Sequence, residues 1–505
     1  MRGRDEARSD HPARFDLERP QLALLRFAGE LGIKARATRR QFHHQLIRNL
    51  KDAISSQGSI PKIRASRDRA FVEVRSSDDI DALTRVFGVQ SVSLVERRTE
   101  TKLSEIVRAG EDLFRERIRG RRFAVRARRV GDRSRISVKS TDVERDLGTA
   151  LLPVSAGVDL DHPEVTLYVE IFEDETCFFP ERIRAHGGIP LGVEGHALAL
   201  VSGGFDSPVA AWQLLKRGVD LDYVFCNLGG AAHLQDALRV IKVLADRWSY
   251  GHRPRLHVVD FQGLSAELQS KTATRYWQIL LKRQMLRVAE CIARERRALA
   301  IVTGEAVAQV SSQTLQNISV ISEAASGLVL RPLVGFNKEE IIAMARLIGT
   351  FELSQVVGEY CDIVPSRPAT AAQLGAILAE EEKLDLSRVE AVAAARDVYD
   401  LRNFDVEKLE VSELDIERIP DGAIVIDLRS KAEFDGWHHP EALHLDFTKA
   451  LNAYSHFEAR SSYVLYCEFG LKSAHLALLL RERGIDAFHV KGGTRTLRHA
   501  AARND

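Results

Sequence analysis

The order of apolar and polar positions divides the chain into stretches with different patterns. From Leu22 to about Asp174, strands alternate with helices. FVEVRS (71–76) and VTLYVEIFED (165–174) alternate with the period of two that a half-buried strand shows, and DDIDALTRVFG (78–88) has the spacing of a helix ending at Gly88. This pattern predicts α+β domains at the N-terminal end.

The middle stretch replaces alternation with continuous apolar runs, which helical segments separate. A Gly/Pro-rich connector, GGIPLGVEG (187–195), precedes them. Short apolar runs between helices are typical of a parallel sheet that is buried on both faces, so we expect a doubly wound α/β domain. The runs are ALALV (197–201), YVFCNL (223–228), LHVVDF (256–261) and ALAIV (298–302).

The last stretch restarts as a second, smaller α/β unit. Residues 371–401 have a helical pattern, and a polar linker follows to about Arg418. AIVIDLR (423–429) and YVLYC (463–467) then have the composition of buried strands, and SAHLALLLRERG (473–484) that of a helix ending at Gly484. These segments suffice for one compact module.

Composition narrows the class of protein. With 505 residues we expect three or four domains, and the net charge is only +1. No apolar run reaches the roughly 18 residues that a membrane span needs, and the N-terminal MRGRDEARSD lacks the apolar stretch of a secretory signal. Five scattered cysteines form neither a disulfide framework nor a C-x-x-C zinc pattern. We therefore expect a cytoplasmic protein with reduced thiols and no membrane partner.

Charge gathers in one segment. Residues 113–139 carry eleven Lys and Arg against two acidic residues. Within FAVRARR (123–129), alternation places Phe123, Val125 and Ala127 on one face and Arg126 and Arg128 on the other. The basic face has two interpretations, a solvated charged surface or a surface that contacts nucleic-acid phosphates.

The most informative local motif is SGGFDSPVA (202–210), between the strand ALALV and a helix. Its glycines let the backbone approach an anion, and the helix N-terminus supplies free N–H groups. Ser207 suits the N-cap and Pro208 the first helical position. The motif resembles the pyrophosphate loop of ATP-dependent, AMP-forming enzymes; the alternative is a plain glycine-rich turn.

Two later segments fit an ATP site. TGEAVAQVSSQTLQN (303–317) follows a strand at its carboxyl end, where open α/β sheets bind ligands. In RPLVGFNKEEII (331–342), Asn337 is a predicted helix cap with Glu340 three residues on. Lys338 then begins the helix, either as a surface lysine or as a group that reaches a phosphate.

Two cysteines are candidates for chemistry. Cys467 ends a strand and begins CEFGLKS, before a helix; successive backbone N–H groups there would stabilise a thiolate or persulfide, although a buried structural cysteine is the alternative. The loop EYCDIVPSRP leaves the role of Cys361 open. Cys177, Cys226 and Cys291 sit in apolar patterns typical of core positions.

Taken together, these motifs resemble the tRNA 4-thiouridine synthetase (tRNA sulfurtransferase) family, in its long form with a C-terminal rhodanese-like domain. The resemblance covers nearly the whole chain from about Gln21. It rests on SGGFDSPVA, FCNLGGAAH (225–233), LLKRQM (280–285), VTGEAVAQVSSQTLQN (302–317), LRPL (330–333) with NKEEII, EYC (359–361) and YCEFGLKS (466–473).

The resemblance implies a sequence of domains after a charged extension (1–20). These are an N-terminal ferredoxin-like domain (21–77), a THUMP RNA-binding domain (78–182), a pyrophosphate-loop ATP-binding domain (183–401), a linker (402–418) and a rhodanese-like domain (419–505).

It also implies roles for single residues. Asp206 and Lys338 match residues needed for activation, Cys467 the persulfide carrier and Cys361 its redox partner. The basic segment becomes an expected RNA contact, with Arg121, Arg122, Arg126, Arg128 and Arg129. The residues expected to bind ATP are Leu200, Val201, Ser202, Gly203, Gly204, Asp206, Ser207, Lys282, Gly304 and Gln313.

The implied reaction uses ATP and Mg²⁺ to adenylate O4 of a tRNA uridine, at position 8 in the family, and a protein-bound cysteine persulfide to replace that oxygen with sulfur. The implied partners are tRNA, a PLP-dependent cysteine desulfurase, a thiamine-pathway sulfur-carrier protein and a second copy of the chain. Sulfur transfer to the thiazole of thiamine is a further implied role.

Two alternatives remain at this level. One is another enzyme with the same ATP loop, such as a tRNA 2-thiolation enzyme or an amidotransferase-type ligase. The other is a tRNA-binding or sulfur-relay protein without catalysis. The presence of Asp206, Lys338, Cys361 and Cys467 together argues against the second.

Overall fold

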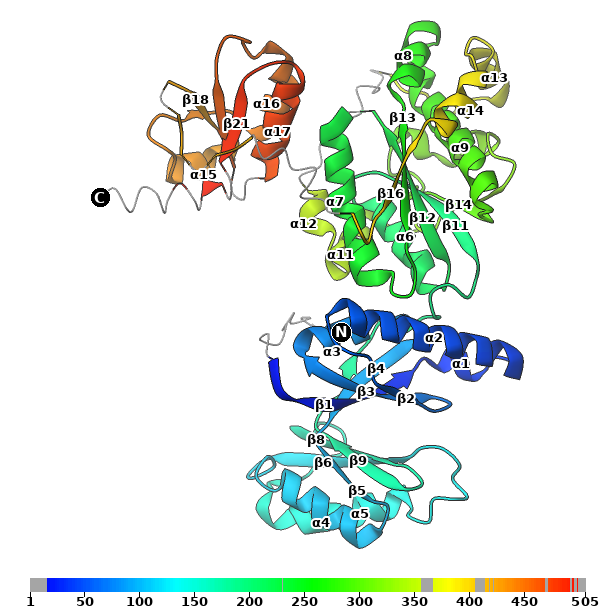
Figure 1. The fold of residues 1–505 in the computed structure, drawn as a ribbon, viewed down its shortest axis with the longest axis vertical. Coiled ribbons are helices and arrows are strands. Elements are labelled where there is room, and N and C mark those ends of the chain that lie inside the picture. The colour runs from blue at the N-terminus through cyan, green and yellow to red at the C-terminus, as the bar shows by residue number, and fades with distance from the viewer. Residues whose placement is uncertain are drawn as a thin grey trace. The chain divides into compact units, whose positions relative to one another are not determined.

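A computed structural model describes residues 16–228, 230–355, 367–404, 414–416, 418–420, 422–467, 471–490, 493, 494 and 497. The chain forms two compact units, each with two β-sheets (Figure 1). The first unit runs to Ala197 and includes residues 212–221 and 245–254; the second comprises residues 198–211, 222–244 and 255 onward. In the described part of the chain, no helix is long and apolar enough to cross a membrane.

The first sheet is antiparallel, in the order β10-β4-β1-β3-β2. Leu46 and Leu50 of α2 and Leu83 of α3 pack with Leu25 and Val72 of the sheet in one buried core. Its elements are β1 (Asp16–Phe27), α1 (Gly29–Gly32), α2 (Arg36–Ser56), β2 (Ile63–Ala65), β3 (Arg69–Ser76), α3 (Ser77–Arg85), β4 (Val89–Val95) and β10 (Ile183–Arg184).

Two expected boundaries of this domain are wrong. Strand β1 begins at Asp16, which pairs with Ser76, so the predicted extension (1–20) overlaps the strand. The domain was expected to end at residue 77, but β4 pairs with β1 along most of its length. Helix α3 and strand β4, which follow residue 77, therefore belong to the first domain: β4 is a strand of its sheet, and α3 packs in its core. Pairing between strands so far apart in sequence leaves no local signal.

The second sheet has the order β5-β9-β8-β6-β7, and helices α4 and α5 pack together against it. The predicted alternation in β6 is confirmed, because Phe123 and Val125 are buried whereas Arg126 and Arg128 are exposed. Its elements are β5 (Arg97–Glu100), α4 (Leu103–Phe114), β6 (Arg122–Arg129), α5 (Ser140–Leu151), β7 (Gly157–Val158), β8 (Val165–Ile171) and β9 (Glu175–Phe179).

A buried ion cluster joins these two sheets. Glu170 of β8 accepts from Arg26 Nε of β1 at 2.6 Å and from Arg69 Nε of β3 at 3.0 Å. The Arg26 guanidinium also lies 4.5 Å from the ring centroid of Phe179. Burial alone would raise the pKa of Glu170, but Arg26 and Arg69 outweigh it and hold that pKa below its ordinary value.

The third sheet has the order β15-β14-β11-β12-β13-β16. Strand β14 pairs in parallel with β15 and β11, β12 pairs in parallel with β13, and β16 pairs antiparallel with β13. Figure 1 shows α6, α7 and α11 on one side of it and α8, α9 and α14 on the other, as the doubly wound prediction requires. Its strands are β11 (His196–Val201), β12 (Asp220–Asn227), β13 (Arg255–Asp260), β14 (Ala300–Val302), β15 (Leu328–Leu330) and β16 (Asp397–Asp400).

Helices connect these strands and follow the last parallel one. They are α6 (Asp206–Lys216), α7 (Gly230–Trp248), α8 (Gln262–Lys271), α9 (Trp277–Arg296), α10 (Leu315–Ser322), α11 (Lys338–Ile348), α12 (Phe351–Ser354), α13 (Leu374–Glu381) and α14 (Ser387–Ala394). The helical prediction for residues 371–401 is wrong at its end, where β16 forms an antiparallel edge strand. Four residues are too few to show a period.

The fourth sheet is parallel, in the order β17-β21-β20-β18-β19. The predicted strands and helix are confirmed within a few residues at each end, and Arg429 forms a buried ion pair with Asp427 at 2.6 Å. Its elements are β17 (Asp415–Ile416), β18 (Ile424–Asp427), α15 (Lys431–Gly436), β19 (Leu443–His444), α16 (Phe447–Ala453), β20 (Tyr463–Tyr466), α17 (Leu471–Glu482) and β21 (Ala487–Val490).

Glu170→Gln should lower the free energy of unfolding by about 3–5 kcal/mol at neutral pH, because it leaves buried guanidinium groups uncompensated. Chemical denaturation would measure this. The folded pKa of Glu170 is lowered, so its contribution is complete above an ordinary carboxyl pKa of about 4.3 and fades below it. Glu175→Gln is the control: Glu175 pairs with the exposed Arg64 and Arg98, and its loss should cost less than about 1 kcal/mol. Equal losses from both variants would contradict this account.

Candidate active site

A cavity of about 490 Å³ opens where β11 and β14 lie side by side in the third sheet. The order of the strands reverses at this pair, since β11 leads to β12 on one side and β14 to β15 on the other. Ligands of open α/β sheets bind beyond the carboxyl ends of strands at such a point. All ten residues predicted to bind ATP line this one cavity: Leu200, Val201, Ser202, Gly203, Gly204, Asp206, Ser207, Lys282, Gly304 and Gln313.

The loop after β11 is closed by its own serines. Ser207 Oγ accepts from the backbone N–H of Ser202 at 2.9 Å and donates to the Ser202 carbonyl at 3.3 Å. The prediction that Ser207 is the N-cap is wrong, because α6 begins at Asp206 and the hydroxyl serves the loop instead. Pro208 falls in the first turn, where no N–H partner is lost. These hydrogen bonds close the loop before any ligand binds, and the N-terminus of α6 lies at the end of the loop.

Gly304, just beyond β14, packs directly on that loop. A Cβ atom at residue 304 would lie 2.8 Å from Ser207 N and 2.9 Å from Asp206 C. Both of these atoms are backbone and cannot rotate away. Only glycine allows the two segments to approach this closely, so Gly304 sets the width of the cavity.

One wall of the cavity holds a buried carboxylate between two cations. Glu305 Oε1 accepts from Lys282 Nζ at 3.0 Å, and Oε2 accepts from Arg331 Nε at 2.8 Å and from Thr303 Oγ1 at 3.2 Å. Burial would raise the pKa of Glu305, but Lys282 and Arg331 together lower it. The group therefore keeps its negative charge and holds Lys282 at the cavity.

The two residues predicted for activation are in contact. Lys338 Nζ lies 2.8 Å from Asp206 Oδ1, and Gln309 Nε2 donates to Asp206 Oδ2 at 2.8 Å. The predicted capping box of α11 is confirmed, since Asn337 and Glu340 each accept from the other's backbone N–H. This cap places Lys338 at the first position of the helix.

The remaining lining suits a nucleotide. Phe225, Leu281, Met285 and Ile321 offer an apolar wall for a base. The buried Oε1 of Gln313 has no hydrogen-bond partner among the described residues, and an unpaired buried acceptor is stabilised when a ligand donates to it. A Cβ at Gly204 would meet only Ser202 Oγ, at 3.6 Å, so the loop is open to a phosphate.

The described side chains do not by themselves form a binding site for a metal ion. In the part of the chain that the structure describes, no group of three or more His, Cys, Asp or Glu side chains could hold one. Mg²⁺ characteristically keeps several waters and binds through substrate phosphates.

Cys467 follows β20 directly and lies four residues before α17. Its thiol is buried, with Sγ 3.6 Å from Ser473 Oγ in the first turn of the helix. This is the strand-to-helix position that the sequence predicted. The other candidate, Cys361, lies outside the described residues.

The cysteines predicted to be structural differ in burial. Cys177 and Cys226 are buried, and burial raises the pKa of both thiols, that of Cys177 to about 12. Cys291 on α9 is half-buried, and burial raises the pKa of its thiol as well. Such thiols stay protonated near neutral pH and are poor nucleophiles.

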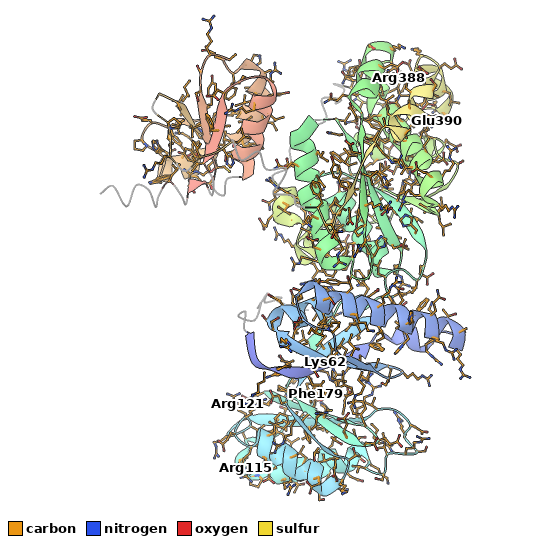
Figure 2. The ribbon with its side chains drawn as sticks, in the orientation of Figure 1. Lys62, Arg115, Arg121, Phe179, Arg388 and Glu390 are labelled. Atoms are coloured by element: carbon orange, nitrogen blue, oxygen red, sulfur yellow. The ribbon has the colours of Figure 1, made fainter. Side chains whose placement is uncertain are left out.

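The predicted RNA-contacting arginines lie along β6 or just before it. Arg121, Arg126 and Arg128 are exposed, Arg129 is half-buried, and Arg122 pairs weakly with Asp159 at 3.5 Å. Arg121 is labelled in Figure 2 on the domain that also carries Arg115. Within the described chain, the guanidinium groups of Arg121, Arg128 and Arg129 make no ion pair, so their charge is available to an anion.

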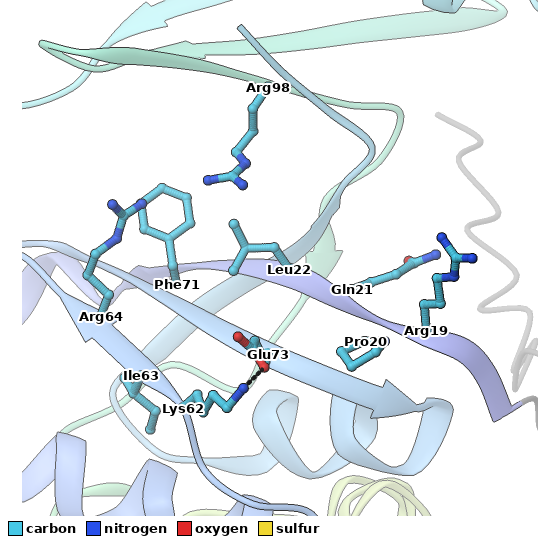
Figure 3. Close-up of a pocket in the computed structure, with 10 residues that line it drawn as sticks. All are labelled: Arg19, Pro20, Gln21, Leu22, Lys62, Ile63, Arg64, Phe71, Glu73 and Arg98. Atoms are coloured by element: carbon cyan, nitrogen blue, oxygen red, sulfur yellow. Dashed lines mark ion pairs between the residues drawn. The ribbon is translucent and has the colours of Figure 1, made fainter.

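A basic hollow, which no sequence motif indicates, lies in the same unit. It measures about 730 Å³ and lies between β1, β2, β3 and β5 (Figure 3). Arg64 stacks 4.7 Å from the ring centroid of Phe71, and Lys62 pairs with Glu73 at 2.9 Å. Arg19 and Arg98 complete the basic lining. These residues come from separate strands and form no motif in the sequence.

Comparison with known families supports the expected fold class. A family model described as thiamine biosynthesis protein (ThiI) matches residues 192–386. Models of the ThiI ferredoxin-like domain, the THUMP domain and the rhodanese-like domain match residues 22–93, 100–179 and 412–499. The four predicted domain types are confirmed.

Individual proteins match over nearly the whole chain. A tRNA sulfurtransferase of Thermoplasma acidophilum is 35% identical over 473 residues, covering 93% of this chain and 94% of that protein. One from Edwardsiella ictaluri is 34% identical, covering 92% and 99%. A crystal structure of a 4-thiouridine synthetase–RNA complex with bound ATP is 30% identical, with a TM-score of 0.66, covering 75% of this chain and 99% of that one.

Gly304→Ala should weaken ATP binding about tenfold or more, since overpacking costs about 1–3 kcal/mol and here displaces the loop backbone. Binding titration with ATP would measure the effect. Gly335→Ala is the matched control, because a Cβ there meets nothing within 4 Å. Equal ATP affinity in the two variants would show that the contact with the loop does not shape the site.

Proposed function

The chain belongs to the tRNA sulfurtransferase family, and we propose that it uses ATP to convert a uridine of tRNA, expected at position 8, into 4-thiouridine. One observation carries the proposal. Ten residues that the family resemblance assigned to ATP come from four separate segments, and they line one cavity at the switch point of the third sheet.

The first step activates the base. Uridine O4 attacks the α-phosphate of ATP, pyrophosphate leaves, and AMP becomes bonded to C4 through O4. The N–H groups of the 202–207 loop and the N-terminus of α6 would hold the phosphates. Lys282 and Lys338 supply positive charge at the cavity. Mg²⁺, bound through the triphosphate, would further neutralise charge that develops on its oxygens.

The second step replaces oxygen with sulfur. A cysteine desulfurase loads Cys467 as a persulfide, whose terminal sulfur attacks C4 and expels AMP together with O4. The Cys361 thiolate then attacks the Cys467 sulfur, which releases 4-thiouridine and leaves a Cys361–Cys467 disulfide. An external dithiol reduces the disulfide for the next turnover. In the alternative route, the Cys361 thiolate attacks the inner sulfur of the Cys467 persulfide first, which forms the disulfide and releases hydrosulfide; the hydrosulfide then attacks C4 and expels AMP.

Binding of tRNA would use the first unit. Arg121, Arg122, Arg126, Arg128 and Arg129 present positive charge beside the THUMP core, and phosphate contacts dominate affinity for nucleic acids. The basic hollow around Phe71, in the same unit, would offer further positive charge. A similar protein has been solved in complex with RNA.

Further roles follow from the family. The matching family model carries the description of a thiamine biosynthesis protein, so we include sulfur transfer to the thiazole of thiamine through a sulfur-carrier protein. We also expect the active form to be a homodimer. Analytical ultracentrifugation of the full chain tests the latter.

The reaction is tested by incubating unmodified tRNA with the protein, Mg-ATP, cysteine, a cysteine desulfurase and a dithiol, followed by mass spectrometry of the nucleosides. We expect 4-thiouridine that depends on ATP. Sulfur at C2 of uridine instead would favour a 2-thiolation enzyme. No modified nucleoside under these conditions would contradict the proposal.

Cys467→Ala should lower 4-thiouridine formation at least about a hundredfold while ATP affinity is unchanged, because the variant loses the sulfur carrier and not the cavity. Cys291→Ala is the matched control, since Cys291 is a half-buried core cysteine on α9. Thiolation by Cys467→Ala at the wild-type rate would reject the persulfide route through this residue.

Arg128→Ala should weaken tRNA binding and reduce the slope of log affinity against log salt by about 1, as the loss of one phosphate contact requires. Filter binding at several salt concentrations would measure it. The control is Arg145→Ala, because Arg145 already pairs with Asp146 at 2.8 Å. An unchanged slope for Arg128→Ala would remove this arginine from the RNA surface.

A further inference from the structure

The carboxylate of Asp206 has a second partner, Gln309, to which the motif at residues 302–317 assigned no role. One oxygen accepts from Lys338 Nζ, and the other accepts from the side-chain amide of Gln309, each at 2.8 Å. The two donors come from different segments, one from the start of α11 and one from the loop after β14. Asp206 is thus held from both sides.

Among the described residues, the side-chain amide of Gln309 forms a hydrogen bond only with Asp206. Its Oε1 is buried and has no hydrogen-bond partner among the described residues. Rotating the amide by half a turn would bring Oε1 against a carboxylate oxygen, and two acceptors repel each other. The orientation of the amide is therefore set by Asp206, and the unpaired oxygen on its other side is a cost of that contact.

The backbone conformation next to Gln309 is unusual and is held by hydrogen bonds. Ala308 has φ of +65°, a left-handed conformation that residues other than glycine seldom adopt. Its N–H donates to the Gln313 carbonyl at 2.9 Å, and Val307 N–H donates to the Val334 carbonyl at 3.2 Å. These bonds hold a strained turn, and such strain concentrates at functional sites.

A neutral donor suits this position. The lysine at residue 338 is a flexible chain whose side chain is 42% exposed, so its single bond to Asp206 does not stop the carboxylate from turning. A second bond to the other oxygen fixes the carboxylate plane. Because the amide carries no charge, it does this without cancelling the negative charge of Asp206.

We propose that Gln309 is a positioning residue for uridine activation: it fixes the Asp206 carboxylate, and through it Lys338, in the arrangement that the adenylation step uses. The inference rests on the proposed function above and adds a residue to it. Gln309 acts through Asp206 and needs no contact with ATP.

The first test replaces the amide with an apolar chain of similar length. Gln309→Met should lower kcat for 4-thiouridine formation about 10- to 100-fold, with the KM for ATP within about threefold of wild type, as expected when a supporting contact is lost. Gln262→Met, at the exposed start of α8, is the control and should behave like wild type. An unchanged kcat in Gln309→Met overturns the inference.

The second test separates positioning from simple support of the fold. With enzyme in excess over tRNA, Gln309→Met should cause no further loss in an Asp206→Ala background, because its effect passes through that carboxylate. A full additional loss in the double variant overturns the inference. If Gln309→Met melts below wild type, Gln309→Glu keeps the shape but sets a carboxylate against Asp206, and activity equal to wild type would again overturn it.

The two hypotheses fail differently. Wild-type protein that forms no 4-thiouridine removes the proposed function and this inference together. Wild-type protein that forms it, beside a fully active Gln309→Met, removes the inference alone.

Discussion

The candidate active site depends on the contact between two backbone segments, the loop 202–207 after β11 and Gly304 after β14. These strands are neighbours in the sheet although about a hundred residues separate them in the chain. Their carboxyl ends meet where the strand order reverses, and the absence of a side chain at Gly304 lets the loop lie against it. The width of the cavity beside the phosphate loop follows from this contact, because Gly304 packs on the backbone of Asp206 and Ser207.

Charge around the cavity is arranged for an anion. Lys282, Arg331 and Lys338 are three cations, and Glu305 and Asp206 are two carboxylates, so the cluster carries one net positive charge. Each carboxylate holds a cation in place, and the two carboxylates together do not neutralise the positive charge of the site. Such preorganised charge, next to loop N–H groups and beside apolar walls for a base, matches a nucleoside triphosphate.

Local motifs and apolar periodicity predicted most of the fold. The four central parallel strands, the capping box at Asn337, the alternation of β6 and the position of Cys467 all have signals within a few residues, and all were found. What failed depends on long-range pairing. The first domain boundary was misplaced because β4 returns to β1, and β16 was missed because a four-residue edge strand shows no period.

The site shows the same limit. The glycines and serines of SGGFDS form a recognisable phosphate loop, whereas Glu305 and Gln309 are ordinary polar residues whose roles appear only through their contacts with Lys282 and Asp206. Ser207 was assigned the wrong partner because a serine before a helix suits a cap equally well. The hydrogen bond from Ser202 N–H shows that the Ser207 hydroxyl closes the loop and does not cap the helix.

Following the oxygen that leaves the base tests the central claim most directly. Unmodified tRNA that carries ¹⁸O at O4 of uridine would be thiolated with unlabelled ATP, and the nucleotide products analysed by mass spectrometry. Attack of O4 on the α-phosphate predicts that the label appears in AMP, with one AMP for each 4-thiouridine. Label in water or inorganic phosphate, with ADP as the product, would contradict adenylation of the uridine in this cavity.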